Sequence, residues 1–322
     1  MNRRDIRSYV LIALAAVSGA LEAPRLMHAP LSIASAEIAG VPSGIAGAVT
    51  KVAASVTGKH MGFDTNVYPG DRAMDAWKRS GEYEWVGYYL SAPCHSDDSW
   101  VGTRSKLLKN GWGLAVIYVG QQTWGQSYKP VTTTKKVRVA STKSGKRHFA
   151  TRTMKRTSTI PVVTSNDGHC SASFVNTDQG SIDARDAIAT TTREGFPRGT
   201  VVFLDVEYMD AMPPRMRDYY RAWTREVLAD GRYRPGIYAH THNVGTIYDD
   251  VSDVYGAAGV DGDPPFWIAG KGDFSPESSP TEVGHAFATA WQGMLDVVRT
   301  HNGVKLPVDI SVASVASPSL AQ

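Results

Sequence analysis

The sequence predicts an α/β protein, a (β/α)8 barrel of the TIM type. Short apolar runs alternate with helical patterns from about residue 61 to residue 313, as expected for strands that are each followed by a helix. The run at 200–204, which precedes two acids, is apolar on both faces, which is typical of a buried parallel strand. An open doubly wound sheet would explain the first half equally well, but no glycine-rich phosphate loop follows any strand, so its commonest function has no support.

Eight strands and four helices can be placed by their patterns. Apolar or alternating runs predict strands at 61–66, 85–90, 114–119, 200–207, 235–239, 266–269, 286–291 and 308–311. Helical spacing predicts helices at 71–80, 98–110, 181–193 and 215–228, and Gly111 and Gly231 are expected to stop the second and the fourth. We therefore expect strands and helices to alternate around the whole barrel.

The first 60 residues are predicted to be targeting and linking segments. Residues 1–36 have the order of a signal peptide: an arginine-rich start, an apolar run at 9–17, and small residues at 34–36 or, earlier, at 19–23 for cleavage. The apolar run is too short to span a bilayer, and no later segment resembles a membrane span. We expect export to the periplasm or the cell exterior by a Sec or twin-arginine signal, without stable membrane insertion. Residues 37–60 are then a linker or arm, and residues 61–322 the barrel.

The two cysteines, Cys94 and Cys170, fit one disulfide in an exported protein. His95 and His169 adjoin them, so a site with two Cys and two His ligands is the alternative, but the spacing is not that of known zinc sites. We predict the Cys94–Cys170 disulfide, no metal and no cofactor. The formal net charge of +3 is too small to indicate a nucleic-acid partner.

A long insertion, at about 121–178, interrupts the barrel pattern after the third strand. Its segments at 135–139 and 143–156 carry only positive charge, and 143–146 has the composition of a hairpin turn between two Thr-rich strands. The insertion is therefore predicted to be a basic β-hairpin, either solvated or used for docking. A docking surface of this kind would attract an anionic polymer such as an acidic polysaccharide.

Four acids lie at predicted strand ends. Asp205 and Glu207 are two residues apart at the end of an apolar run, so on a strand both point to the same side. Asp64 and Asp309 end the first and the last strands, and in a closed barrel all four meet at one face. Such acids could cap backbone groups or bind an Arg, but crowded carboxyl groups also suit glycoside chemistry, in which one donates a proton and another stabilises or attacks the sugar cation.

Aromatic and amide side chains are predicted at the same level of the barrel, where rings stack on sugars and polar groups bind hydroxyls. These candidate substrate-binding residues are Tyr89, Tyr118, Tyr208, Tyr238, Trp267, Trp291 and Gln292. Gln121 and Gln122 follow the third strand and could also orient sugar hydroxyls. His240 and His242 are placed for acid–base or metal chemistry, although no further ligands accompany them.

A spaced set of motifs resembles the family 25 glycoside hydrolases, the muramidase-type lysozymes, and more closely the secreted glycoside-hydrolase-like family once catalogued as a domain of unknown function. The motifs are GFD at 62–64, GYYL at 87–90, LDVE at 204–207, PGIY at 235–238, FWIA at 266–269, AWQ at 290–292 and VD at 308–309. The resemblance implies that Glu207 is the proton donor, Asp205 its companion acid, and Asp64 and Asp309 the other acids of the site. It also implies cleavage of a polysaccharide, usually peptidoglycan in that family. The basic insertion is not part of the lysozyme pattern, which leaves other envelope or extracellular glycans open.

The sequence thus favours an exported glycoside hydrolase that uses carboxyl groups as general acid and as nucleophile, base or stabiliser. The alternative is a non-catalytic glycan-binding envelope protein that uses the same cleft. A pure binding site gains little from burying several like charges, which favours the enzyme.

Overall fold

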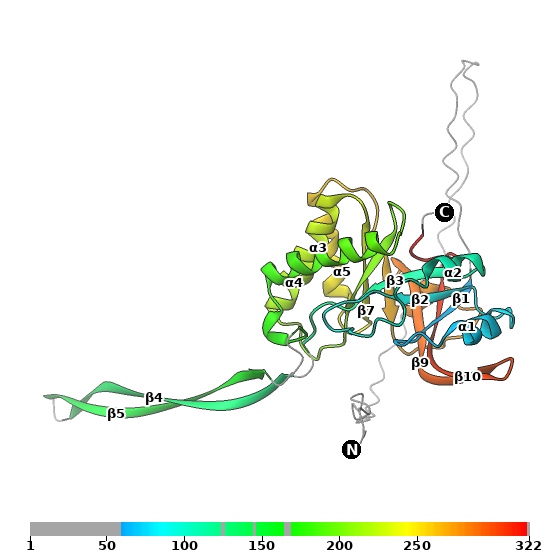
Figure 1. The fold of residues 1–322 in the computed structure, drawn as a ribbon. Coiled ribbons are helices and arrows are strands. Elements are labelled where there is room, and N and C mark those ends of the chain that lie inside the picture. Colours follow the sequence, from blue (N-terminus) through cyan, green and yellow to red (C-terminus); the bar gives the residue numbers. More distant parts are fainter. Residues whose placement is uncertain (1–58, 124–125, 144–145, 164–168, 321–322) are drawn as a thin grey trace, which may run out of the picture. The chain divides into compact units, whose positions relative to one another are not determined.

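The computed structural model describes residues 59–123, 126–143, 146–163 and 169–320, and its centre is a closed barrel of eight strands (Figure 1). The strands follow one another around the barrel in the order β1, β10, β9, β8, β7, β6, β3 and β2. They are β1 (His60–Asp64), β2 (Trp85–Tyr89), β3 (Gly113–Tyr118), β6 (Val201–Val206), β7 (Arg234–His240), β8 (Phe266–Ala269), β9 (Ala288–His301) and β10 (Val304–Ala313). The mixed α/β class and the closed barrel agree with the sequence prediction.

Five α-helices and two short 3₁₀ turns connect the strands in the described part of the chain. The helices are α1 (Asp71–Lys78), α2 (Arg104–Lys109), α3 (Thr177–Arg193), α4 (Pro214–Asp230) and α5 (Val244–Ala257), and the 3₁₀ turns are η1 (Ala172–Phe174) and η2 (Pro280–Val283). Asn176 caps α3 by accepting the backbone N–H of Gln179. Gly231 ends α4 at a positive φ of 67°. The second helix is shorter than predicted, and α3 begins four residues earlier, at its Asn176 cap.

The barrel does not close with an eighth strand–helix unit. β10 pairs antiparallel with both β9 and β1, whereas the other neighbouring strands are parallel. The prediction of strands and helices alternating around the whole barrel is therefore wrong at its C-terminal end. The reason is a two-residue turn between His301 and Val304, in which Asn302 and Gly303 both have positive φ, 47° and 77°. An Asn-Gly pair is well suited to such a tight hairpin turn.

Two apolar clusters lie on the two faces of the barrel wall. The larger cluster lies between strands and helices, and includes Phe63, Leu204 and Trp223. The smaller cluster fills the barrel interior, and its buried members are Trp85, Ala115, Ile117, Val119, Phe203, Trp267, Ala290 and Ala313. A Cβ on Gly62 would lie 2.1 Å from the ring of Trp85, so a glycine is needed on β1 for this tryptophan to fill the interior.

The insertion after β3 contains a separate two-stranded sheet. β4 (Gln126–Lys143) and β5 (Lys146–Val163) pair antiparallel over their full lengths, from the Gln126–Val163 pair to the Lys143–Lys146 pair (Figure 1). The residues between the two strands, 144–145, are outside the described part. After 169 the chain returns to the barrel through η1 and α3.

The predicted signal peptide at 1–36 and almost all of the predicted arm at 37–60 lie outside the described residues. His60, placed at the end of the arm, is instead the first residue of β1. Among the described helices, none combines the length and the apolar character needed to cross a membrane.

Candidate active site

Four carboxyl groups from three strands meet at one mouth of the barrel. Asp64 is the last residue of β1, Asp205 lies near the end of β6, and Glu207 follows that strand directly. Asp309 lies opposite Asp64 in the register of β1 and β10. We expected Asp309 at the C-terminal end of a parallel strand, but it reaches the mouth from the middle of an antiparallel one. The grouping is as predicted, although the topology behind it is not.

Asp64 is a buried carboxyl group held by two neutral hydrogen-bond donors. Its exposed fraction is 4%. The hydroxyl of Tyr89 donates to Oδ1 and the amide Nε2 of Gln292 donates to Oδ2, both at 2.8 Å. Burial and the nearby charge of Asp309 raise the pKa of Asp64 to about 8, against the lowering effect of the two hydrogen bonds. Asp64 therefore holds its proton at neutral pH.

The pKa of Asp309 is raised less than that of Asp64, because Asp309 is less deeply buried, and a backbone N–H stabilises its charged form. The N–H of Asp296 donates to Asp309 Oδ1 at 2.6 Å. Burial raises the pKa of Asp309 to about 6, and this hydrogen bond limits the rise. Asp296 has a positive φ of 53° and sits where the β9–β10 register shifts between Val308 and Ile310. A bulge in β9 thus aims one N–H at the carboxylate.

Gln292 links the two acids and is itself oriented by a tyrosine. The hydroxyl of Tyr238 donates to its Oε1 at 2.7 Å, which directs Nε2 toward Asp64 at 2.8 Å and Asp309 at 3.4 Å. Gln292 is only 1% exposed. The amide therefore holds the two carboxyl groups in a fixed relation.

Asp205 carries a buried oxygen that has no hydrogen-bond partner. Among the described residues, no donor lies within reach of its Oδ1. Burial raises the pKa of Asp205 well above its usual value, and the charges of Glu207 and Asp64 raise it further. An unpartnered carboxyl oxygen in a buried position is costly.

Glu207 is half-buried, and its pKa is also raised. Burial is the main cause, the N–H of Tyr208 opposes it, and the charge of Asp309 adds to it. A glutamic acid whose pKa is shifted upward can keep a proton for donation at pH values where an ordinary one is ionised.

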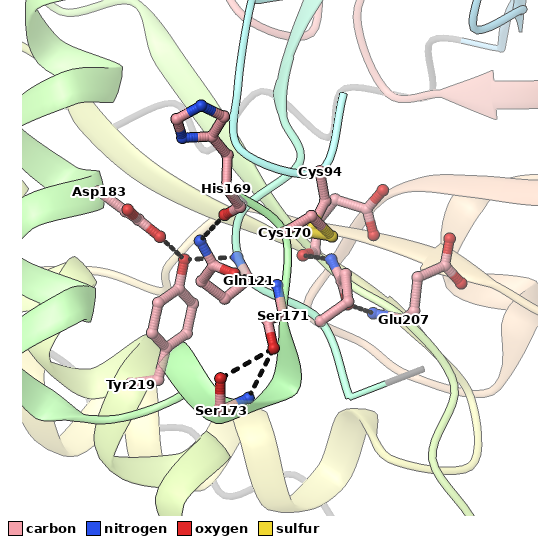
Figure 2. Close-up of a disulfide and its surroundings, with 11 residues drawn as sticks. Cys94, Gln121, His169, Cys170, Ser171, Ser173, Asp183, Glu207 and Tyr219 are labelled. Carbon is pink, nitrogen blue, oxygen red and sulfur yellow. Dashed lines mark hydrogen bonds between the residues drawn. A yellow bond between two sulfur atoms is a disulfide. The ribbon is translucent and has the colours of Figure 1, made fainter. Parts of the chain in front are cut away.

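Two adjacent glutamines, Gln121 and Gln122, connect the disulfide to this mouth, and Figure 2 shows the contacts of Gln121. Gln121 donates from Nε2 to the carbonyl of His169 at 2.8 Å and accepts the N–H of Ser171 at 2.9 Å, so it binds the chain on both sides of Cys170. Gln122 binds the end of β6, where Nε2 donates to the carbonyl of Asp205 at 2.8 Å. Both glutamines are buried. Their amides are therefore used for backbone contacts and not, as predicted, for sugar hydroxyls.

The predicted disulfide between Cys94 and Cys170 is present and joins residues 76 positions apart. It pins the return of the insertion to the loop after β2 (Figure 2). His95, beside it, stacks on the ring of Tyr89 at a centroid distance of 4.8 Å and bonds to the carbonyl of Asn66. Within the described ranges, no three His, Cys, Asp or Glu side chains are grouped so that they could hold a metal ion.

The predicted sugar-binding residues divide into two groups. Tyr89, Tyr238 and Gln292 contact the acids or one another, as described above. Tyr208 is 39% exposed beside the acids, and its ring lies 5.1 Å from that of His240 and 5.3 Å from that of His242. Contact of these four residues with a sugar stays a prediction.

Three of the predicted sugar-binding residues are placed elsewhere. Tyr118 is fully buried on the outer face of the wall and donates to Asp186 of α3 at 2.9 Å. Trp291 is buried on the same side and donates to the carbonyl of Gly270. Trp267 is 1% exposed and packs in the barrel interior, with its ring edge-on to Tyr238. These predictions are wrong because adjacent residues of a strand face opposite sides, and because interior residues below the mouth are covered.

Sequence reasoning missed the roles of Gln122 and Asp296. Gln122 binds backbone groups of Asp205 and Glu207, and Asp296 binds Asp309 through its own backbone N–H. Contacts of backbone groups leave no pattern in the sequence. A weak indication exists for Asp296, because an aspartate inside a strand is unusual and aspartate tolerates positive φ better than most residues.

A closed barrel with several carboxyl groups at one mouth is the arrangement of glycoside-hydrolase-like proteins. Residues 75–312 match the family described as "Rv2525c-like, glycoside hydrolase-like domain", and the chain belongs to this family. Asp64 lies before the matched range, whereas the other three acids lie within it. No curated protein matches the chain.

The solved structures that match this chain are distant from it in sequence, and in each comparison 79% of this chain is covered. An uncharacterized B. stearothermophilus protein is 17% identical, with a TM-score of 0.49 and 95% of that chain covered. The spore cortex lytic enzyme SleM of Clostridium perfringens is 13% identical, with a TM-score of 0.46 and 67% covered. The Tat-secreted protein Rv2525c of Mycobacterium tuberculosis, in complex with L-tartrate, is 15% identical, with a TM-score of 0.42 and 94% covered.

Proposed function

We propose that this protein is an exported glycoside hydrolase that cleaves a cell-wall or extracellular polysaccharide. The observation that carries the proposal is the crowding of Asp64, Asp205, Glu207 and Asp309 at one mouth, where the described residues supply no Lys or Arg partner. No Lys or Arg is among the groups that shift their pKa values. Burying like charges in this way costs stability, so the arrangement is better explained by chemistry than by structure.

Asp250 is a buried acid with a structural role in the same protein, and its partners and pKa can be compared with those of the mouth acids. Its side chain is buried, but Arg217 and Arg221 pair with it, and Tyr220 donates a hydrogen bond. Although burial acts in the opposite direction, these partners together lower the pKa of Asp250. The acids of the mouth have raised pKa values instead, which is the pattern expected of acid–base groups.

The pKa differences support a division of roles. We assign Glu207 as the general acid, because it is half-buried at the mouth and keeps its proton longer than an ordinary glutamic acid. Asp309, with a pKa of about 6, is charged at pH 7 and is suited to be nucleophile, base or electrostatic stabiliser. Asp64, with a pKa of about 8, is protonated there and suited to hydrogen bonding. Asp205 adds an unpartnered oxygen for substrate or water.

Export is the second part of the proposal. The Cys94–Cys170 disulfide supports it, because such bonds persist in oxidising compartments and are rare in the cytosol of most organisms. Residues 1–36 would then be the signal peptide. The polysaccharide is the partner that the mouth would bind, with Tyr89, Tyr208, Tyr238 and Gln292 around it.

The test is product release from a panel of envelope glycans and soluble polysaccharides, measured by mass spectrometry. Glu207→Gln should lower turnover by at least about a hundredfold and keep binding, because it removes the general acid but not the shape of the site. Glu226→Gln, a similar change on α4 in a surface pair with Arg185, is the matched control and should leave turnover unchanged. If the wild type bound one glycan without cleaving any, the proposed enzyme activity would be rejected in favour of a glycan-binding function.

A further inference from the structure

The strands β4 and β5 concentrate the positive charge of the protein. Residues 126–163 hold ten of the 34 Lys and Arg side chains, whereas none of the 31 Asp and Glu side chains lies between residues 121 and 166. The rest of the chain carries 24 basic and 31 acidic side chains, a formal net charge of −7. We call the two strands, residues 126–143 and 146–163, the basic ribbon. The basic ribbon is thus positively charged, whereas the mouth of the barrel is lined by acids.

The basic ribbon presents cations on both of its faces. Register and two-residue periodicity place Lys136, Arg138 and Lys155 on one face, and Lys135 and Arg152 on the other. All five side chains are exposed. In the described part of the ribbon none of them belongs to an ion pair. These cations are free to bind an external anion.

Such a ribbon gains stability from an anionic partner. A two-stranded sheet with both faces in solvent buries little apolar surface and is marginal by itself. Like charges on neighbouring positions of the same face repel one another and weaken it further. A polyanion laid along the ribbon would remove the repulsion, because point charges attract a charged polymer without needing a particular sequence of contacts.

The exposed apolar side chains argue against a lipid surface as the partner. Phe149 and Met154 are each 57% exposed, but their strand positions place them on opposite faces. The guanidinium of Arg138 lies over the ring of Phe149, 4.8 Å from its centre, and covers one side of it. Membrane-binding elements gather their apolar residues on a single face. A polymer that contacts charge on either face fits the ribbon better.

We propose that the basic ribbon binds a linear polysaccharide that bears carboxylate groups. The choice of a polysaccharide rests on the proposed function of the mouth, since a ribbon that grips the same polymer raises its concentration near the acids. The charged carboxylate of Asp309 repels charged sugars from the mouth, so the ribbon would hold the charged stretches while neutral linkages enter the mouth.

The experiment compares two variants with the same change in net charge, both in the Glu207→Gln background so that cleavage does not interfere. The ribbon variant combines K135Q, K136Q, R138Q, R152Q and K155Q. The barrel variant combines R72Q, R79Q, K109Q, R225Q and K305Q, which are exposed positions outside the ribbon. Polygalacturonate is the anionic glycan, dextran the neutral one, and calorimetry at two salt concentrations gives the dissociation constants. Thermal unfolding checks that both variants keep the barrel.

The parent should bind polygalacturonate and not dextran, more weakly at high salt, and the ribbon variant should bind at least about tenfold more weakly than the barrel variant. Equal losses in the two variants would show that only net charge matters and would overturn the proposal. Ribbon-dependent binding that is tighter to duplex DNA, a polyphosphate or phosphatidylglycerol vesicles would assign the surface to that partner instead. A glycan-binding ribbon on a protein that cleaves nothing would reject the proposed function and leave the ribbon as a binding surface.

Discussion

Gln122 spans the end of β6 and holds the backbone on both sides of Val206. Its Nε2 donates to the carbonyl of Asp205 at 2.8 Å, and its Oε1 accepts the N–H of Glu207 at 3.3 Å. The paired register of β3 and β6 ends earlier, at Tyr118 and Leu204. The side-chain amide of Gln122 thus extends the hydrogen bonding of the sheet to Asp205 and Glu207.

Replacing Gln122 should therefore disturb catalysis more than stability alone explains. We expect Gln122→Ala to lower the free energy of unfolding by about 1–3 kcal/mol, because two buried backbone groups lose their partner. It should also lower kcat about tenfold with little change in KM, since Glu207 loses its orientation. Gln179→Ala is the control, because that amide bonds to Asp183 from α3 and does not contact the mouth. Equal effects of both substitutions on kcat would reject the positioning role.

The stability of the protein should fall as pH rises through the neutral range. An acid whose pKa is raised by folding binds its proton more tightly in the native state, so stability is highest at low pH and is lost as pH approaches the folded pKa. For Asp64 this window runs from about 4, the ordinary value, to about 8. We expect Asp64→Asn to flatten this dependence in thermal unfolding between pH 5 and pH 8.

Asp250→Asn should behave differently. The pKa of Asp250 is lowered, so its contribution is present at neutral pH and is lost only at acid pH. This substitution should lower the free energy of unfolding at pH 7 by about 1–3 kcal/mol.

If Asp64→Asn left the pH dependence of stability between pH 5 and pH 8 unchanged, the titration of another group would be its cause.

The bulge at Asp296 can be tested with two small substitutions. Asp296→Gly keeps the N–H that binds Asp309 and removes the strain of a side chain at positive φ, so it should preserve turnover. Asp296→Ala keeps the strain and should be less stable than the glycine variant by about 1 kcal/mol. The charge of Asp296 raises the pKa of Asp309, so both variants should move the acidic limb of the pH–rate profile to lower pH. If the acidic limb did not move in either variant, the titration of Asp309 would not be its cause.

The disulfide should stabilise the fold and, through Gln121, the mouth. We expect the double variant Cys94→Ser, Cys170→Ser to lose about 2–4 kcal/mol of unfolding free energy, because the bond closes a long loop. Turnover should fall as well, even under conditions where the variant is fully folded. Denaturant unfolding and kcat, measured with and without a reducing agent on the wild type, separate the two effects. Full turnover of the reduced, folded protein would limit the disulfide to stability.

The barrel could be predicted because each strand is a compact apolar run between polar segments. The closing hairpin could not be predicted from those runs, since β9 and β10 continue well beyond the apolar stretches at 286–291 and 308–311. Their extensions alternate between half-buried and exposed residues around Asn302 and Gly303, the pair that sets the turn. That pair was the available sign of an antiparallel closure.

Asp64, Asp205 and Glu207 could be placed together because each lies at or next to the end of a parallel strand, and such ends meet at one mouth. Asp309 could not be placed on that ground, because it lies in the middle of the antiparallel strand β10. The aromatic residues were less predictable. A strand that is apolar on both faces does not indicate which face a given ring takes, so Tyr118 and Trp291 were assigned to the wrong side of the wall. The contacts of Gln122 and Asp296 depend on distant backbone groups, which only the folded chain brings together.

The closing hairpin also governs when the site can exist during synthesis. Gln292 and Asp64, which bond directly, are separated by 228 residues, and Asp309 comes from the last strand of the barrel. A chain still on the ribosome therefore holds Asp64, Asp205 and Glu207 without the strands that complete the mouth. Under the proposed function, a nascent or truncated chain would be inactive, and glycoside hydrolysis would first appear only after β9 and β10 have been made and paired.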